Sequence, residues 1–142
     1  MNASIRSTLI ASALTLVALA ITVPAMAQQS SRIQFERGND NAAAQGSITG
    51  REYRDYVLRA GAGQSMSAAL SVESTNGHGS AYFNILPPDS DNVAIFNSSR
   101  SDNNYGSVTL PEDGDYRIRV YLMGNDRDAG KTVAYTLSVT IM

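Results

Sequence analysis

The sequence predicts an all-β protein: a single antiparallel β-sandwich of about eight or nine short strands, jelly-roll-like in type. Apolar and polar residues alternate strictly in several segments, most clearly from Ser65 to Glu73 and from Tyr116 to Met123. A period of two is typical of a strand with one dry and one wet face. Turn residues separate the alternating segments at the spacing expected of sandwiches. No window after residue 27 shows a sustained helical period.

Four strands are expected in the first half of the domain. The first alternates Ile33 and Phe35 with polar residues, and the second ends at Gly50. The third places Tyr56 and Leu58 on one face, and the fourth is the long alternation noted above. Polar, glycine-containing segments separate them, because glycine reaches turn conformations without steric cost. These four strands span residues 31–36, 45–49, 52–60 and 65–73.

Five more strands are expected in the second half. Pro87 and Pro88 end the fifth, because proline cannot donate to a strand ladder. A polar loop is expected at residues 97–104. The turn signal Asp113-Gly114 precedes the eighth strand, and the polar run 124–131 is expected to be a loop between the last two. These strands span residues 81–85, 93–96, 107–110, 116–123 and 133–141.

Residues 1–27 are predicted to be a secretory signal peptide, and residues 28–142 the β-sandwich domain. Leu9 to Val23 are almost wholly apolar, and Ala25-Met26-Ala27 fits the small-x-small cleavage pattern. The apolar stretch is too short and too weakly flanked to predict stable membrane insertion. The chain has no cysteine, which excludes disulfides and a lipoprotein signal. The domain must therefore bury a core large enough to fold unaided.

Composition argues against nucleic-acid binding and against catalysis. The formal net charge is −2, and no run of basic residues exists. His78 is the sole histidine and, lying between two glycines, is expected to be a solvated loop residue. With no cysteine and one histidine, nucleophile–histidine and zinc arrangements are incomplete. We therefore predict no enzyme, no catalytic residues, no metal site and no cofactor.

Two acidic segments leave an alternative open. Residues 89–92 and 125–128 each carry alternating carboxylates, which can bind Ca²⁺ through oxygen ligands or simply form turns. Neither contains the full calcium-loop pattern with its closing glutamate. On the eighth strand, Tyr121 shares a face with Arg117 and Arg119, which is either a solvated surface or a contact patch. Tyr116, by contrast, falls on an apolar face and is expected in the core with a bonded hydroxyl, as is Tyr135.

Several short motifs follow one another along the chain in an order typical of a known family. They are residues 33–38 (IQFERG), 46–50 (GSITG), 53–56 (YRDY), 63–64 (GQ), 110–116 (LPEDGDY), 119–120 (RV), 125–126 (ND) and Tyr135. In these motifs the chain resembles the bacterial periplasmic inhibitors of g-type lysozyme. The resemblance implies a single β-sandwich in the periplasm that blocks the lysozyme cleft with loops carrying aromatic and basic residues. It points to g-type lysozyme as partner, and to Arg51, Tyr53, Asn125, Asp126 and Arg127 as partner-binding residues.

Some positions depart from the family pattern. Arg51 stands where inhibitory members carry tyrosine, and residues 124–128 (GNDRD) replace Arg-Asn-Asp-Ala-Arg. Asp128 adds a negative charge that would face a catalytic carboxylate. Part of the scaffold also resembles secreted β-sandwich domains at the C-terminal ends of bacterial peptidases. The alternative hypothesis is therefore a calcium- or carbohydrate-binding envelope or matrix module with no lysozyme target.

Overall fold

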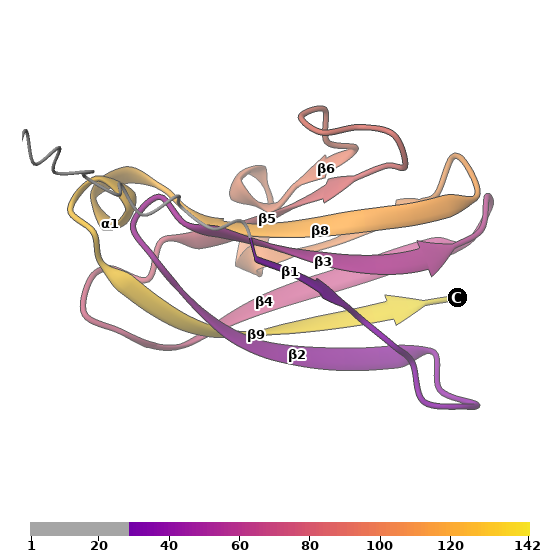
Figure 1. Ribbon diagram of the computed structural model, residues 1–142, viewed down its shortest axis with the longest axis horizontal. Coiled ribbons are helices and arrows are strands. Elements are labelled where there is room, and N and C mark those ends of the chain that lie inside the picture. The colour runs from indigo at the N-terminus through magenta and orange to yellow at the C-terminus, as the bar shows by residue number, and fades with distance from the viewer. Residues whose placement is uncertain (1–28) are drawn as a thin grey trace, which may run out of the picture.

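The computed structural model describes residues 29–142, which form two sheets and one short helix (Figure 1). The predicted signal peptide, residues 1–27, lies outside the described residues. The strands are β1 (Gln29–Arg32), β2 (Asn41–Thr49), β3 (Tyr53–Ala60), β4 (Ser65–Thr75), β5 (Ala81–Leu86), β6 (Phe96–Asn97), β7 (Tyr105–Thr109), β8 (Gly114–Leu122) and β9 (Thr132–Ile141). The helix is α1 (Gly124–Asp128), and two 3₁₀ turns are η1 (Ser98–Arg100) and η2 (Asp102–Asn104).

The strands divide into a five-stranded sheet, in the order β1-β3-β8-β5-β6, and a four-stranded sheet, in the order β2-β9-β4-β7. The all-β prediction is thereby confirmed at the level of fold class. The expectation of purely antiparallel pairing is wrong at one edge, because β1 runs parallel to β3 with Gln29 opposite Arg54. No hairpin joins β1 to its neighbour, since the chain crosses from β1 to β2 in the other sheet.

Inward-facing residues of both sheets make one hydrophobic core. Leu58 and Ile118 come from the five-stranded sheet, and Leu70 and Leu137 from the four-stranded sheet. Tyr116 and Tyr135 are buried with bonded hydroxyls, as predicted: the first donates to the Glu112 carbonyl at 2.6 Å, and the second lies 2.8 Å from the Tyr56 hydroxyl. The period of two in the sequence thus separates core from surface.

Several predicted boundaries are wrong. The first strand was expected at residues 31–36, but β1 ends at Arg32, and Ile33 and Phe35 pack on the core without belonging to a strand. The polar segment before residue 45 joins β2, because pairing with β9 begins at Asn41. The expected strand 93–96 shrinks to β6, residues 96–97. The polar run after residue 123 begins with a helical turn, α1, in place of an irregular loop.

No helix among the described residues is long and apolar enough to cross a membrane.

Candidate functional site

Three connections between strands meet at the end of the molecule where Figure 1 places α1. They are the β2–β3 turn (residues 50–52), the β4–β5 loop (residues 76–80) and the β8–β9 connection, which contains α1. The Gly50 amide donates to the Lys131 carbonyl at 2.9 Å, and the Met123 amide donates to the Ser80 carbonyl at 3.0 Å. Because backbone hydrogen bonds join the connections, they form one continuous surface, here called the loop end.

The β2–β3 turn reaches the β8–β9 connection because residue 50 is glycine. Gly50 has φ of 60°, which lies in the left-handed region that side chains disfavour. A Cβ atom there would also lie 3.2 Å from the Gly130 Cα atom. The glycine therefore sets the position of Arg51, the next residue, beside α1.

Asp126 holds α1 against the β4–β5 loop. Its side chain is fully buried, and its two oxygens accept hydrogen bonds from backbone amides, Oδ1 from His78 at 2.9 Å and Oδ2 from Ser80 at 2.7 Å. These amides stabilise the carboxylate and lower its pKa below the usual value. Asp126 therefore lies beneath the loop end and shapes it from inside.

Further contacts fix the β4–β5 loop. Thr132 donates its amide to Asn76 Oδ1 at 2.9 Å, and the Asn76 amide returns a bond to the Thr132 carbonyl at 3.4 Å. A Cβ atom at Gly77 would lie 2.3 Å from Asp126 Oδ1, so the loop can approach the carboxylate only with glycine there. His78 is exposed, as expected, but its backbone belongs to this arrangement.

Arg51, Arg127 and Asp128 form an exposed charged trio. Asp128 Oδ1 lies 3.0 Å from Arg127 Nε and 3.3 Å from Arg51 Nη2. The hydrogen bond from Arg127 lowers the pKa of the Asp128 carboxyl, and the charge of Arg51 adds to this effect. Side-chain exposures of 68% for Arg51 and 45% for Arg127 make these ion pairs weak. Both guanidinium groups are thus available to a stronger anionic partner.

Tyr53 lies behind the β2–β3 turn, on β3, and is half-buried. The Arg119 guanidinium carbon lies 4.4 Å from the centre of its ring. Arg119 is fixed in turn by Asp55, donating from Nε to Oδ1 at 2.8 Å and from Nη2 to Oδ2 at 2.9 Å. This paired carboxylate raises the pKa of the Arg119 guanidinium. The Arg/Tyr face of β8 is therefore an ordered network.

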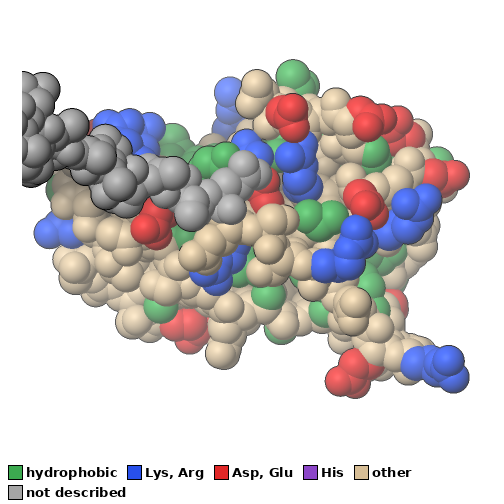
Figure 2. Space-filling view, viewed as in Figure 1, with side chains coloured by type: hydrophobic (Ala, Val, Ile, Leu, Met, Phe, Trp, Pro, Cys, Tyr) green, Lys and Arg blue, Asp and Glu red, His purple; other side chains and the backbone are tan. Residues whose placement is uncertain are grey.

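Asn125 is exposed at the loop end, beside the charged trio. Its backbone carbonyl accepts the Ala129 amide at 2.8 Å, which closes the single turn of α1. Figure 2 shows basic and acidic side chains intermingled over the visible face. The loop end thus gathers four of the five predicted site residues from two connections, and Tyr53 lies on the adjoining strand.

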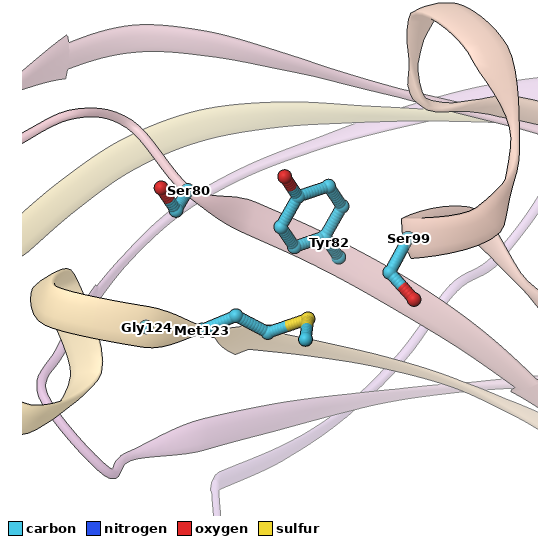
Figure 3. Close-up of a pocket in the computed structure, with 5 residues that line it drawn as sticks. All are labelled: Ser80, Tyr82, Ser99, Met123 and Gly124. Atoms are coloured by element: carbon cyan, nitrogen blue, oxygen red, sulfur yellow. The ribbon is translucent and has the colours of Figure 1, made fainter.

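An uncharged hollow of about 280 Å³ adjoins the loop end. Figure 3 shows Tyr82 and Met123 beside it, between Ser80 and Ser99. Gly124 lines the hollow and also begins α1, so the hollow is continuous with the charged loops. Nothing in the sequence pattern predicted it, because Tyr82 lies on β5 and Met123 directly follows β8, and the two meet only through the pairing of β5 with β8.

Three of the four carboxylates considered as calcium ligands, those of Asp91, Asp126 and Asp128, have other partners in the fold. Both Asp126 oxygens accept amide hydrogens, and Asp91 Oδ1 accepts a bond from Arg117 Nη2 at 2.9 Å. Within residues 29–142, no group of three or more His, Cys, Asp or Glu side chains is placed to hold a metal ion. The chemistry available at the loop end is hydrogen bonding and ion pairing through Arg51, Asn125 and Arg127.

The chain is similar to proteins that inhibit lysozyme. It is 28% identical over 129 residues to the inhibitor of g-type lysozyme of Escherichia coli K12, covering 91% of this chain and 93% of that protein. The crystal structure of Aeromonas hydrophila PliG, a periplasmic inhibitor of g-type lysozyme, is 30% identical, with a TM-score of 0.72, and covers 80% of this chain and 96% of that one. No family profile matches the chain.

A second likeness concerns the fold alone. The pre-peptidase C-terminal domain of a Bacillus anthracis collagenase is 17% identical, with a TM-score of 0.57, and covers 80% of this chain and 97% of that domain. The resemblance to peptidase-associated β-sandwich domains noted in the sequence is thereby confirmed.

Proposed function

The chain belongs to the family of periplasmic inhibitors of g-type lysozyme, and on this basis we propose that it binds such a lysozyme and blocks its active-site cleft with the loop end. Its named relatives are inhibitors and not enzymes, and they act in the periplasm. We accordingly assign the chain to the periplasm, with residues 1–27 as its signal peptide. Inhibition proceeds by occlusion, with no chemical step and no cofactor.

Arg127 is proposed to enter the cleft toward the catalytic carboxylate. The observation that supports this role is its placement on α1, whose neighbouring residue Asp126 is anchored in the protein while Arg127 is exposed. A guanidinium held on a fixed turn loses little conformational entropy on binding, and its planar fork matches a carboxylate. Arg51 and Tyr53 would contact the wall of the cleft from the β2–β3 side.

The direct test is inhibition of g-type lysozyme by the purified domain, with c-type and i-type lysozymes assayed in parallel. We expect inhibition of the g-type enzyme at nanomolar concentration and none of the other two. Absence of inhibition of all three enzymes would refute the proposed function and show that this member has kept the fold and changed its partner.

Replacing Arg127 tests the mechanism within that assay. Arg127→Ala removes a charged hydrogen bond to the catalytic carboxylate, so the Kd for g-type lysozyme should rise at least about tenfold. Arg37→Ala, an exposed arginine in the β1–β2 connection at the other end, is the matched control and should leave the Kd unchanged. An equal Kd for wild type and Arg127→Ala would remove Arg127 from the mechanism.

A further inference from the structure

The β4–β5 loop projects an exposed side chain at the loop end, although its backbone is tightly held. His78 is exposed between Gly77 and Gly79, and its amide is bonded to the buried carboxylate of Asp126, the residue directly before Arg127 in α1. The imidazole therefore stands on the same surface as Arg127. Neither the resemblance nor the predicted site included this loop.

The loop is held at its start by Thr132 of β9, which bonds Asn76, and over the rest of its length by α1 and the residue before it. Asp126 binds the amides of His78 and Ser80 within 2.9 Å, and Met123, just before α1, donates its amide to the Ser80 carbonyl. A five-residue helix is too short to be stable alone. The loop and the helix therefore fix each other, and the carboxylate that joins them is shielded from solvent.

We propose that the β4–β5 loop is a third part of the lysozyme-binding surface, and that Asp126 is the positioning residue that holds it, and His78 with it, beside α1. This inference rests on the proposed function of the loop end. Asp126 itself touches no lysozyme atom. It acts by fixing the geometry of two connections that are otherwise joined directly only by the bond from the Met123 amide to the Ser80 carbonyl.

The chemistry of the surface agrees with a buried Asp126 that positions the loop and exposed side chains that contact the lysozyme. The amides of His78 and Ser80 stabilise the Asp126 charge from inside the protein, and its burial keeps this carboxylate from direct contact with an acidic cleft. The exposed groups from the three connections include the donors Arg51, His78 and Arg127. Holding these groups in place before binding reduces the entropy lost in the complex, which raises affinity without adding contacts.

A double-mutant cycle tests the positioning role. Asp126→Asn replaces one acceptor oxygen by a donor facing a backbone N–H, and we expect the Kd for g-type lysozyme to rise at least about fivefold. His78→Ala should raise it about threefold or more. If Asp126 acts by holding His78, the double variant should bind about as well as Asp126→Asn alone, because the two effects share one contact. Full additivity of the two effects would overturn the positioning role.

The matched control is Asp113→Asn at the opposite end. Asp113 Oδ1 likewise accepts a backbone amide, that of Ala62 at 2.7 Å, and its loss should change the Kd less than about twofold. Amide hydrogen exchange of the free protein gives a second reading. The His78 and Ser80 amides should exchange faster in Asp126→Asn, while the amides of β8 and β9 stay protected. Unchanged exchange at both amides would overturn the role of Asp126.

Two further outcomes separate this inference from the function on which it rests. If wild type binds lysozyme and Arg127→Ala weakens binding, yet His78→Ala does not, the third contact is refuted and the proposed function stands. If wild type does not bind, the proposed function has failed, and the surface role of the loop fails with it. Should Asp126→Asn not fold, Gly77→Ala disturbs the same contact, because its Cβ would lie 2.3 Å from Oδ1, and it should weaken binding equally.

Discussion

At the residue scale, Asp128 is the position at which we expect a single charge to change the affinity of the loop end for lysozyme. It forms ion pairs with both Arg51 and Arg127, and all three side chains are exposed. These pairs add little stability, because solvent screens them. They do, however, occupy the guanidinium groups proposed to meet the cleft, and in the proposed complex they would place a negative charge in front of the catalytic carboxylate.

Asp128→Asn should therefore strengthen binding. Removing the charge frees both arginines and relieves like-charge repulsion, so we expect the Kd for g-type lysozyme to fall about threefold to tenfold. The gain should be largest in the association rate and should shrink as salt is added. Surface plasmon resonance at two salt concentrations measures both effects.

Asp115→Asn controls for the change in net charge. Asp115 is exposed on β8 and pairs with Arg32 at 2.9 Å, away from the loop end. Its replacement should leave the Kd unchanged within about twofold. Weaker binding by Asp128→Asn would mean that the ion pair orients Arg127, and that repulsion at this position is the smaller effect.

At the scale of elements, β3 and β8 are joined by side chains as well as by their backbone ladder. Asp55 is fully buried and lies opposite Arg119, with a two-point contact at 2.8 and 2.9 Å. Arg119 also covers the ring of Tyr53. This network lies on the face of the five-stranded sheet opposite the core and runs from Asp55 to Tyr53, next to the loop end.

Arg119→Met should destabilise the protein by about 2–3 kcal/mol, because it removes a two-point partner from a buried carboxylate while keeping much of the side-chain volume. Urea unfolding at constant m value measures this. Arg59→Met on β3 is the control: its side chain is 73% exposed, its carboxylate partner Asp115 is 3.9 Å away, and the expected change is below about 0.5 kcal/mol. Equal effects of the two variants would show that the burial of Asp55 does not determine how much the Asp55–Arg119 ion pair contributes to the free energy of unfolding.

The sequence predicted the long strands well and the short elements poorly. Alternation over eight or more residues identifies β4, β8 and β9 because one face of each must enter the core. Pairing, in contrast, extended β2 through Ala42 and Ala44, where no local pattern indicates a strand. The parallel position of β1 also depends on a partner far along the chain.

The sequence indicated which residues belong to the candidate site, but not which of them are buried. The charged segment 124–128 lies between two strongly alternating strands, so its place in the site, with that of Arg127, could be predicted from the sequence. The burial of Asp126 depends on amides of His78 and Ser80, which are 48 and 46 residues away in sequence. The same holds for Asp55, which reads as an ordinary polar residue on a strand until Arg119 covers it. The roles of Asp126 and Asp55 depend on contacts with residues that are distant in sequence, so the sequence alone did not predict them.

At the scale of the whole molecule, several charged side chains already have partners within the fold. Basic and acidic side chains intermingle on the visible surface (Figure 2), and several of the acidic ones form ion pairs or accept backbone amides. A bound cation would have to displace these internal partners. This bears on the alternative that the chain is a calcium-dependent envelope module.

Millimolar calcium should accordingly leave the melting temperature within about 1 °C of its value in EDTA, because a ligand stabilises a protein only by binding its folded state. Differential scanning calorimetry of the wild-type domain measures this. A rise of several degrees that is lost in Asp91→Ala would contradict the expectation and favour the calcium-binding alternative, since Asp91 would then exchange Arg117 for the ion.

The contact between Asp126 and the β4–β5 loop involves only main-chain atoms of the loop. The imidazole of His78 and the hydroxyl of Ser80 take no part in it, so other residues at these two positions would leave the anchorage intact. Substitutions at residues 78 and 80 should therefore leave the fold of the loop unchanged. A library randomised at residue 78 would therefore vary the exposed side chain while the same backbone contacts hold the loop.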